Sequence, residues 1–432
     1  MVPTELPVIE TNVASNRDAP PVSEVPAPNS WLNRNVLAFG FTSLLADLCY
    51  ETATSVLPAL LVVVGAPPFA LGLMEGLADA LSSFVKMGAG WFSDRLPRRK
   101  PIVVLGYGVT AISIGLIGLV TFWPIILLLR VAAWIGKGAR GPARNAMLTA
   151  SVRPEDKGKA FGFHRAGDTI GAIIGPIVAA ALIGGFGAEG AKAAEPYQWV
   201  ILATLVPGLA SAAVVAFFVT EPLRGPGKPR QFWESLSALP ARYRRWLVAV
   251  GVFGAGDFSH TLLILGTINA LTPSRGFVEA TQIGALLFSL RNIAAAIAAF
   301  PAGALSDRIG RQKILFATYL LGAIVVAAFG VVVTVGHAGI PLMALLFVGA
   351  GVVNAAQEAL EGAAASDLVP DHSLHGTAFG VLGAVNGVGD FISSVIVGAL
   401  WTIAPEIGFG YAATMMFLGA ALLLRAVVPQ ES

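Results

Sequence analysis

Charged residues are scarce in this chain of 432 residues, because Asp, Glu, Lys and Arg together make up only 12% of it. A water-soluble domain carries roughly 25%, so the composition excludes an ordinary soluble protein. The formal net charge is only +2, which excludes a nucleic-acid partner recognised by bulk charge. Cysteine occurs once, as Cys49, which excludes an internal disulfide framework and a thiolate metal cluster.

Several sequence motifs of pumps and enzymes are missing as well. No stretch contains the phosphate-binding loop G-x-x-x-x-G-K-[ST], which argues against ATP-driven pumping within this chain. Neither H-E-x-x-H nor G-x-S-x-G occurs, which argues against a zinc metalloprotease or a serine hydrolase of those types. We therefore expect no enzyme activity and no cofactor.

Apolar residues, in contrast, make up 55% of the chain, and the mean hydropathy is +0.74. Twelve membrane-spanning helices of about 20 residues need ~240 mostly apolar positions, and 55% of 432 residues supplies about that number. The composition therefore predicts an all-α membrane protein with 12 transmembrane helices. The predicted spans lie near 36–64, 68–92, 102–122, 125–149, 160–184, 198–219, 246–271, 278–303, 314–335, 340–363, 376–403 and 408–428.

Polar segments divide the chain into four predicted parts. Residues 1–33 are rich in proline and contain no apolar run, so we expect a disordered cytoplasmic tail. Residues 220–245 are polar and basic and are predicted to form a cytoplasmic linker. The linker separates an N-terminal six-helix bundle at 34–219 from a C-terminal six-helix bundle at 246–432.

Positive charge predicts the orientation in the membrane. Arg and Lys gather in the loops after the second, fourth and eighth spans and in the linker, whereas the alternate loops hold only Lys192 and Arg275. Loops rich in Lys and Arg face the cytoplasm. We therefore expect a multi-pass protein of the bacterial inner (plasma) membrane with both termini in the cytoplasm.

The two predicted halves share sequence patterns. The segment GWFSDRLPRRK at 90–100 returns as GALSDRIGRQK at 303–313, and GKAFG at 158–162 returns as GTAFG at 376–380. Each copy follows the same ordinal span of its half, at offsets of 213 and 218 residues. The pattern indicates a duplication into two pseudo-symmetric six-helix halves, an architecture that places a substrate site between the halves near the membrane midplane.

The repeated loop resembles the signature G-x-x-x-D-R-x-G-R-R/K-x of the major facilitator superfamily, and the resemblance covers about residues 34–428. The first copy departs from the signature at Pro97, where the second copy has Gly310. The resemblance implies two bundles that rock around a central site and give alternating access. It also implies a cytoplasmic gate, formed by Asp94, Arg95, Arg98, Asp307, Arg308 and Arg311. Alternatively, these loops only set the topology and the turn geometry.

Three more residues are assigned to the gate by their position. Arg144, Arg165 and Asp168 lie near the cytoplasmic ends of the fourth and fifth spans, where they either take part in closure or extend to the membrane interface. The fifth span continues with Gly167, Gly171 and Gly175-Pro176, which is similar to a motif of proton-coupled drug exporters in this superfamily. These glycines serve equally well as a packing ridge.

Ionisable residues near the middle of the spans point to a polar cavity, because charges inside a membrane are costly and usually face a cavity or a partner. The resemblance implies that spans 1, 4, 7 and 10 line this cavity, and most of these residues fall on those spans. The alternative is a set of structural ion pairs, such as Asp47 or Glu51 with Lys137. The candidate cavity residues are Asp47, Glu51, Lys137, Asp257, His260, Glu358 and Asp390.

The residue types suggest the chemistry. A carboxylic acid in a medium of low dielectric constant keeps its proton more readily than in water and can exchange it near neutral pH. Asp47, Glu51, Asp257 and Glu358 are therefore candidates for proton coupling. Asp257 and His260, three residues apart, are a weak candidate pair of metal ligands. Outside the cavity, Trp residues near the span ends predict contact with the lipid bilayer.

We interpret the chain as a secondary active transporter, most simply a monomer, that moves a small molecule or ion by alternating access. Proton-coupled export, with protons as the second partner, is the favoured form. The alternatives are export of a divalent metal or metal chelate, proton-linked uptake of an organic anion, and a transport-inactive membrane sensor or scaffold. The sequence does not identify the substrate.

Overall fold

The structure, a computed structural model, describes residues 30–93, 96–185, 193–221, 236–335, 339–371 and 374–427. The predicted tail up to residue 29, most of the linker, and the gate residues Asp94 and Arg95 lie outside these ranges. Within them the secondary structure is helical, with no strand.

The first half of the chain forms a bundle that we call the N-terminal half. Its helices are α1 (Arg34–Val63), α2 (Pro68–Ser93), α3 (Lys100–Ile117), α4 (Trp123–Ala150), α5 (Lys157–Gly185), α6 (Glu195–Ala203) and α7 (Leu205–Phe218), with a short 3-10 helix at Pro154–Asp156 before α5.

The second half of the chain forms the C-terminal half. Its helices are α9 (Ala241–Gly254), α10 (Thr261–Arg275), α11 (Phe277–Ile309), α12 (Arg311–Val335), α13 (Ile340–Leu368), α14 (His375–Trp401) and α15 (Pro405–Val427).

The predicted fold of twelve spans in two six-helix halves is confirmed. Nine of the described helices are long and apolar enough to cross a membrane. Two of the other three spans carry charged residues in their interior, Glu75 and Asp79 on α2 and Arg130 and Lys137 on α4. The third is interrupted between α9 and α10. Helices α9 and α10 are each too short to cross a membrane alone, because the span that they form is interrupted.

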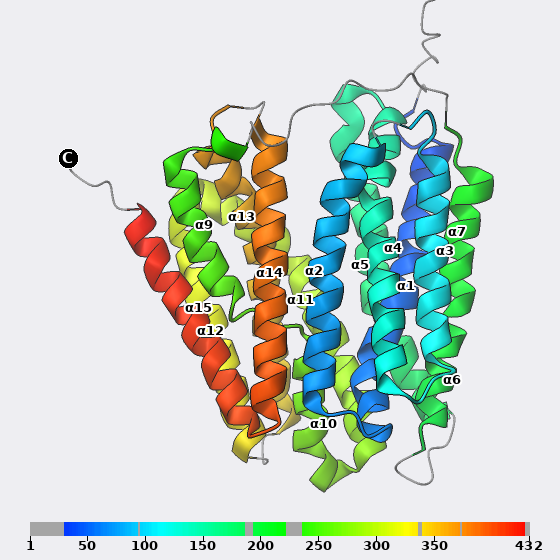
Figure 1. The fold of residues 1–432 in the computed structure, drawn as a ribbon, viewed down its shortest axis with the longest axis vertical. Helices are drawn as coiled ribbons and strands as arrows, with labels where there is room; N and C mark the ends of the chain where they lie inside the picture. The colour runs from blue at the N-terminus through cyan, green and yellow to red at the C-terminus, as the bar shows by residue number, and fades with distance from the viewer. Residues whose placement is uncertain are drawn as a thin grey trace, which may run out of the picture.

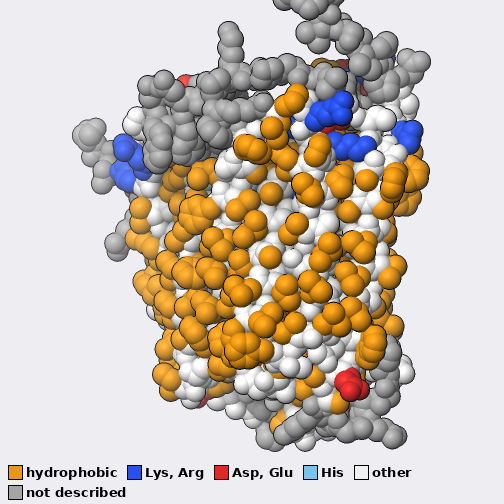
Figure 2. Space-filling model, turned by 45° about the vertical axis from the view of Figure 1, so that its right-hand side comes forward, with side chains coloured by type: hydrophobic (Ala, Val, Ile, Leu, Met, Phe, Trp, Pro, Cys, Tyr) orange, Lys and Arg blue, Asp and Glu red, His pale blue; other side chains and the backbone are white. Residues whose placement is uncertain are grey.

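The outer surface fits a membrane environment. Figure 2 shows a broad belt of hydrophobic side chains, with Lys and Arg above it and little charge within it. Large apolar side chains such as Phe217 (76% exposed) and Phe300 (83% exposed) point outward from the helices. A surface of this kind is stable in lipid and unstable in water.

The N-terminal end of α1 and the C-terminal end of α15 lie at the same end of the bundle (Figure 1). The described basic residues of the loops between α2 and α3, α4 and α5, and α11 and α12 also lie there, and we call this the basic end. At the other end, called the opposite end, the chain turns between α1 and α2 and between α10 and α11.

The two halves meet most extensively along two pairs of helices, α2 with α14 and α5 with α11. Figure 1 shows α14 beside α2 at the middle of the molecule. The backbones come very close towards the opposite end, because a Cβ atom on Gly72 would lie 2.1 Å from the carbonyl oxygen of Ser394 and 3.1 Å from the Cα atom of Gly398. Glycine therefore permits the contact between the halves at this end.

The repeated loop adopts different forms in the two halves. Gly310 alone separates α11 from α12, with φ of 109°, a conformation that is open to glycine and not to proline. Pro97, at the same position of the first copy, lies in a longer connection between Ser93 and Lys100. Where the first copy departs from the signature, the two loops therefore differ in backbone conformation and in length.

The seventh span is broken in its middle. Helix α9 ends at Gly254 and α10 begins at Thr261, so the segment 255–260 is not helical. The sequence Gly-Ala-Gly at 254–256 favours this break, because glycine destabilises a helix interior. The backbone N–H of Ser259 instead donates a hydrogen bond to Oγ of Ser394 on α14 (3.0 Å).

Candidate substrate site and gate

In the N-terminal half, the most deeply buried charges form an ion pair. Arg130 on α4 donates from Nε to one oxygen of Glu75 on α2 (2.9 Å) and from a terminal nitrogen to the other (3.0 Å). Both side chains are at most 2% exposed. Thr54 accepts a further hydrogen bond from Arg130, and the Trp134 ring lies 3.6 Å from the guanidinium carbon. The pair is therefore fully satisfied.

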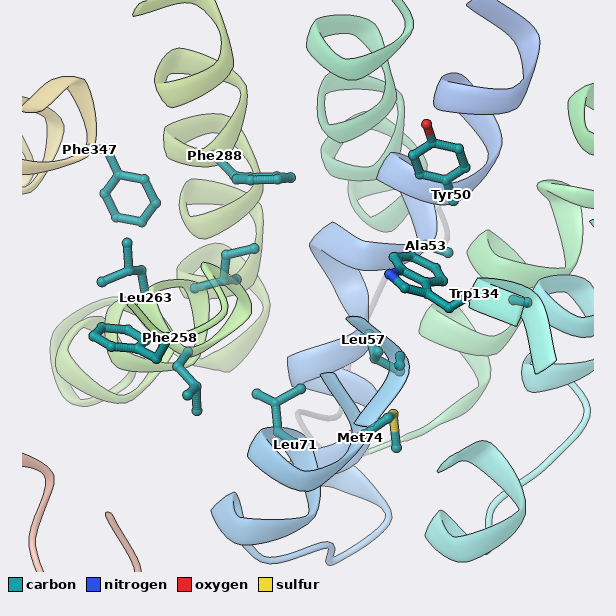
Figure 3. Close-up of a cluster of buried hydrophobic side chains, with 14 of the residues drawn as sticks. Tyr50, Ala53, Leu57, Leu71, Met74, Trp134, Phe258, Leu263, Phe288 and Phe347 are labelled. Carbon is teal, nitrogen blue, oxygen red and sulfur yellow. The ribbon is translucent and has the colours of Figure 1, made fainter. Parts of the chain in front are cut away.

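Tyr50 and Trp134 form an aromatic surface beside this pair. Their rings meet edge to face at 6.0 Å, and Figure 3 shows both on the side of the N-terminal half that faces Phe288 of α11. The Lys137 ammonium lies 4.1 Å from the Tyr50 ring centre and 4.9 Å from that of Trp134. Trp134 also donates to Asp79 (2.7 Å). Lys137 is thus held by ring faces and forms no ion pair within 4.0 Å in the described residues.

Asp47 lies in the contact between α1 and α5. Its side chain is 8% exposed and accepts a hydrogen bond from the hydroxyl of Tyr50. A Cβ atom on Gly171 of α5 would lie 2.8 Å from the Asp47 side chain. The glycines of α5 therefore pack against α1, as one of the two interpretations of this motif expects.

A second polar group joins the same two helices nearer the basic end. Ser43 of α1 donates to Asp168 of α5 and is 3.0 Å from Nε2 of His164. His164 and Asp168 are also within 3.4 Å of each other. Asp168, predicted as a gate residue, is thus bonded within its own half.

Glu51 has a different environment from Asp47. One of its carboxylate oxygens is buried and has no hydrogen-bond partner among the described residues. Lys137 of its own half and Arg291 of the C-terminal half both attract it electrostatically, although neither forms an ion pair with it. Glu51 is therefore a half-buried acid at the boundary between the halves, and the cations Lys137 and Arg291 lie near it without forming ion pairs with it.

In the C-terminal half, the break between α9 and α10 opens into a pocket. Asp257, Phe258 and His260 line it from the broken segment, together with residues of α11, α12, α13 and α15. Its empty volume is about 460 Å³, including open solvent at its mouth. The His260 ring stacks on Phe288 at 4.7 Å, and Nε2 of His260 is buried without a hydrogen-bond partner in the described residues.

Arg291 on α11 also lines this pocket. Its side chain is 9% exposed and donates hydrogen bonds to Asn292 (3.2 Å) and Asn354 (2.8 Å). Its Nε has no partner among the described residues, and no described carboxylate lies within 4.0 Å of the guanidinium. Gln357 approaches the carboxylate of Asp257 across the pocket.

An exposed ion pair joins the halves near the basic end. Arg165 of α5 contacts Glu358 of α13 at 3.1 Å, with side chains 71% and 60% exposed. Both residues were predicted to be functional, Arg165 in the gate and Glu358 in the cavity, and the structure brings them together. Exposed pairs contribute at most about 1 kcal/mol, so this contact holds the halves only weakly.

The other predicted gate residues lie within one half or outside the described ranges. Arg311 contacts Asp307 (3.3 Å) and Asp367 of α13 (3.1 Å), all within the C-terminal half. Arg144 bonds its neighbour Asn145. Arg98 is exposed at the basic end, and Arg308 lies on the last turn of α11, while Asp94 and Arg95 are not described.

Two further acids occupy the C-terminal half. Glu361 of α13 is 2% exposed and accepts hydrogen bonds from Tyr319 (2.6 Å) and Asn386 (2.7 Å). Asp390 on α14 is half-buried and lies within electrostatic reach of Asp257 and Lys86. Asp390 therefore belongs to the same central region as Asp257.

The described residues contain no group of three or more His, Cys, Asp or Glu side chains placed to bind one metal ion. The sequence-based pair Asp257 and His260 does share the pocket, with no third ligand of these types beside it in the described ranges.

The sequence located the acids on α1 and at the break, and it missed Arg291, Asn354 and Gln357 as pocket residues. Arg291 carries the clearest signal, since it is the one charged residue in the apolar run 280–303. Asn354 and Gln357 are uncharged, and their role follows only from the break that exposes them to Asp257.

Comparisons with known proteins agree with this architecture. The family model of the Major Facilitator Superfamily matches residues 39–281 and 264–432. An uncharacterized MFS-type transporter of Methanocaldococcus jannaschii is 30% identical, over 91% of this chain and 95% of that protein. The multidrug resistance protein MdtG of Proteus mirabilis is 23% identical, over 93% of this chain and 96% of that protein.

Two solved structures have a similar fold. The nucleoside transporter NupG has a TM-score of 0.71 at 14% identity, over 91% of this chain and 97% of that one. A bacterial homolog to the human lysosomal transporter Spinster, in an inward-facing and unoccupied conformation, has a TM-score of 0.67 at 16% identity, over 93% and 100%. The helices, the repeated halves and these matches show that this chain belongs to the major facilitator superfamily of membrane transporters.

Proposed function

We propose that this transporter exports a small solute in exchange for protons. The observation that carries the proposal is the position of Glu51 and Asp257, two carboxyl groups that approach the centre from opposite halves and form no ion pair within the described residues. A carboxyl group without a fixed cation can be neutral in one state of the transporter and charged in another. Such a group can carry a proton in one direction and release it to admit a solute.

The packing of the halves supports alternating access. Away from the basic end, α5 and α11 are joined by hydrogen bonds from Gln282 to the carbonyl oxygen of Ala180 (2.9 Å) and from Ser289 to that of Ile173 (2.8 Å). Near the basic end, the halves are linked by the exposed ion pair between Arg165 of α5 and Glu358 of α13. This difference between the two ends supports a protein whose halves separate more easily at the basic end.

The direction of transport is proposed from relatives. MdtG of Proteus mirabilis, similar over most of the chain, is named a multidrug resistance protein. Export is the activity that such a name implies, and it suits a carboxyl-based proton exchange, because the proton gradient of a bacterial membrane is directed inward.

Everted membrane vesicles test the proposal. The vesicles are energised so that their interior becomes acidic, and a pH-sensitive dye reports the loss of the gradient after addition of ethidium, Mn²⁺, benzoate or L-phenylalanine. An exported solute should dissipate the gradient in wild-type vesicles. Glu51→Gln and Asp257→Asn should abolish the response, while the exposed Glu279→Gln should keep it.

Asp47→Asn is the third variant of this set. We expect a smaller effect, because Asp47 is held by Tyr50 between α1 and α5. Unchanged proton exchange in all three variants would contradict the proposed coupling. A response to Mn²⁺ alone would favour metal export instead.

A further inference from the structure

We propose that the pocket at the break between α9 and α10 binds a small zwitterion with an apolar side group, for which an apolar α-amino acid is the model. The proposal rests on the proposed function, since it takes this pocket as part of the transport path. It adds the class of substrate, which neither the fold nor the relatives supply.

Two opposite charges face the pocket without neutralising each other. Arg291 and Asp257 both line it, yet neither forms an ion pair within 4.0 Å with any described residue, and their hydrogen-bond partners Asn292, Asn354 and Gln357 are uncharged. A buried charge without a partner is costly. A ligand that carries a negative and a positive group a few ångströms apart offsets both costs at once, whereas a simple anion or cation offsets only one.

The groups around Arg291 suit a carboxylate. Nε of Arg291 and Nε2 of His260 are buried and have no hydrogen-bond partner among the described residues. A guanidinium group donates strong hydrogen bonds to carboxylate oxygens, and a neutral imidazole donates from its protonated nitrogen. The negative group of the ligand is therefore placed at this side of the pocket.

The other polar side of the pocket suits an ammonium group. The Asp257 carboxylate accepts hydrogen bonds, and the Gln357 amide next to it donates one to it. A primary ammonium with three donors can bind the remaining lone pairs of this carboxylate.

The rest of the pocket is apolar. Val325 and Val326 of α12, Val353 of α13 and Met416 of α15 line it behind the broken segment. Gly322 faces the same region, with Val353 Cγ1 3.2 Å and Met416 Sδ 3.6 Å from the position that its Cβ would take. An apolar side group gains free energy there, and a polar one loses its hydration.

Proton exchange follows from this arrangement. When the Asp257 carboxyl is protonated, it no longer offers a negative charge to the ligand ammonium, so the proton and the zwitterion compete for one residue. Exchange then needs no second coupling site in the C-terminal half.

Ligand-dependent thermal unfolding of the purified full-length protein tests the inference without a proton gradient. The probes are L-phenylalanine, 3-phenylpropionate (no ammonium), 2-phenylethylamine (no carboxylate) and glycine (no apolar group). A ligand that binds only the folded state raises Tm. We expect L-phenylalanine to raise Tm by roughly 2 °C or more at saturation, and each of the other three to raise it by less than half as much.

Substitutions test whether L-phenylalanine binds in this pocket. Arg291→Gln should abolish the shift, Arg291→Lys should retain part of it, and Arg275→Gln, at an exposed pair far from the pocket, should keep it fully. If Arg291→Gln does not fold, Gly322→Leu provides an independent test, because its side chain fills the apolar part and should also abolish the shift. Binding that survives in both Arg291→Lys and Gly322→Leu unchanged would overturn the location.

The remaining outcomes are distinguishable. An equal shift with 3-phenylpropionate or with 2-phenylethylamine would overturn the zwitterion, since one charge then suffices. No shift with L-phenylalanine, together with proton exchange driven by another solute, would overturn this inference and leave the proposed function intact. A shift that depends on Arg291, without proton exchange for any solute in vesicles, would support the inference and contradict the coupling.

Discussion

Glu75 and Arg130 illustrate how single residues differ between the two halves. Each is at most 2% exposed, and each has its hydrogen bonds satisfied, by the other and by Thr54 and Ser259. Arg291, at 9% exposed, has only uncharged partners, Asn292 and Asn354, and its Nε has none among the described residues. The Glu75–Arg130 pair thus stabilises the fold, whereas Arg291 keeps a donor available to a ligand.

The buried pair of Glu75 and Arg130 predicts how substitutions change the free energy of unfolding. Glu75→Gln should destabilise the protein by about 3–5 kcal/mol, because it leaves the Arg130 charge buried and unpaired. The double variant Glu75→Leu with Arg130→Met should recover most of the loss, since it removes both charges. Tm of the purified proteins is the measurement, and Glu279→Gln, in an exposed pair, serves as a control with a change of at most about 1 kcal/mol. Equal Tm for Glu75→Gln and wild type would show that the pair contributes nothing.

The sequence identified charged residues in the spans but not their partners. Spacing places Glu75 and Asp79 on one face of a helix, yet the rotation of α2 against α4 decides which of them meets Arg130, and that rotation depends on packing across the whole bundle. In the structure, Arg130 donates a hydrogen bond to Glu75, and Trp134 donates one to Asp79. The alternative interpretation, in which Lys137 pairs with Asp47 or Glu51, depended on the same missing information, and Lys137 instead lies over aromatic rings.

At the scale of helices, the connection between α11 and α12 depends on one glycine. Gly310 has a positive φ of 109°, and nothing lies within 4 Å of the position of its Cβ. The constraint is therefore in the backbone and not in the space around it. The first copy of the loop, with Pro97, reaches α3 through more residues.

Alanine substitutions separate the effect of backbone conformation at Gly310 from the effect of the space around it. Gly310→Ala should destabilise the protein by about 1–3 kcal/mol through backbone strain. Gly303→Ala, inside α11 and equally free of neighbours, should be neutral or stabilising by about 0.5–1 kcal/mol. Thermal unfolding of the two variants side by side is the measurement. A lower Tm for Gly303→Ala than for Gly310→Ala would contradict the assigned role of φ.

Apolar runs predicted all twelve spans, because a helix in lipid must be long and apolar. They did not predict the break at 255–260, since Val, Phe and Ala on both sides keep the hydropathy high. The available signal was local: Gly254 and Gly256 around one alanine, followed by Asp257 and Ser259, which favour non-helical backbone. In a membrane such a break is tolerated only where the backbone finds other partners, and those partners are distant in sequence.

At the scale of the molecule, the halves are joined most closely at the opposite end. A Cβ atom at position 398 on α14 would lie 3.3 Å from the Cα atom of Phe69 on α2. Alternating access requires these helices to separate, so a covalent link between them should stop transport.

A disulfide tests this requirement. Phe69→Cys with Gly398→Cys, in a Cys49→Ala background, places one thiol on each side of this close contact, and a disulfide joins cysteines whose Cα atoms lie about 4.4–6.8 Å apart. The oxidised protein should lose proton exchange in vesicles, and a reductant should restore it. Each single cysteine variant is the control and should remain active after oxidation. Full activity of the completely cross-linked protein would contradict rocking of the two halves.

Ser394 connects the pocket to this contact. Its hydroxyl accepts the backbone N–H of Ser259 in the broken segment, and its carbonyl oxygen lies against Gly72 of the other half. When α14 moves away from α2, the broken segment either follows or loses that hydrogen bond. Ligand occupancy and the separation of the halves are therefore thermodynamically linked, and by reciprocity each shifts the equilibrium of the other by the same factor.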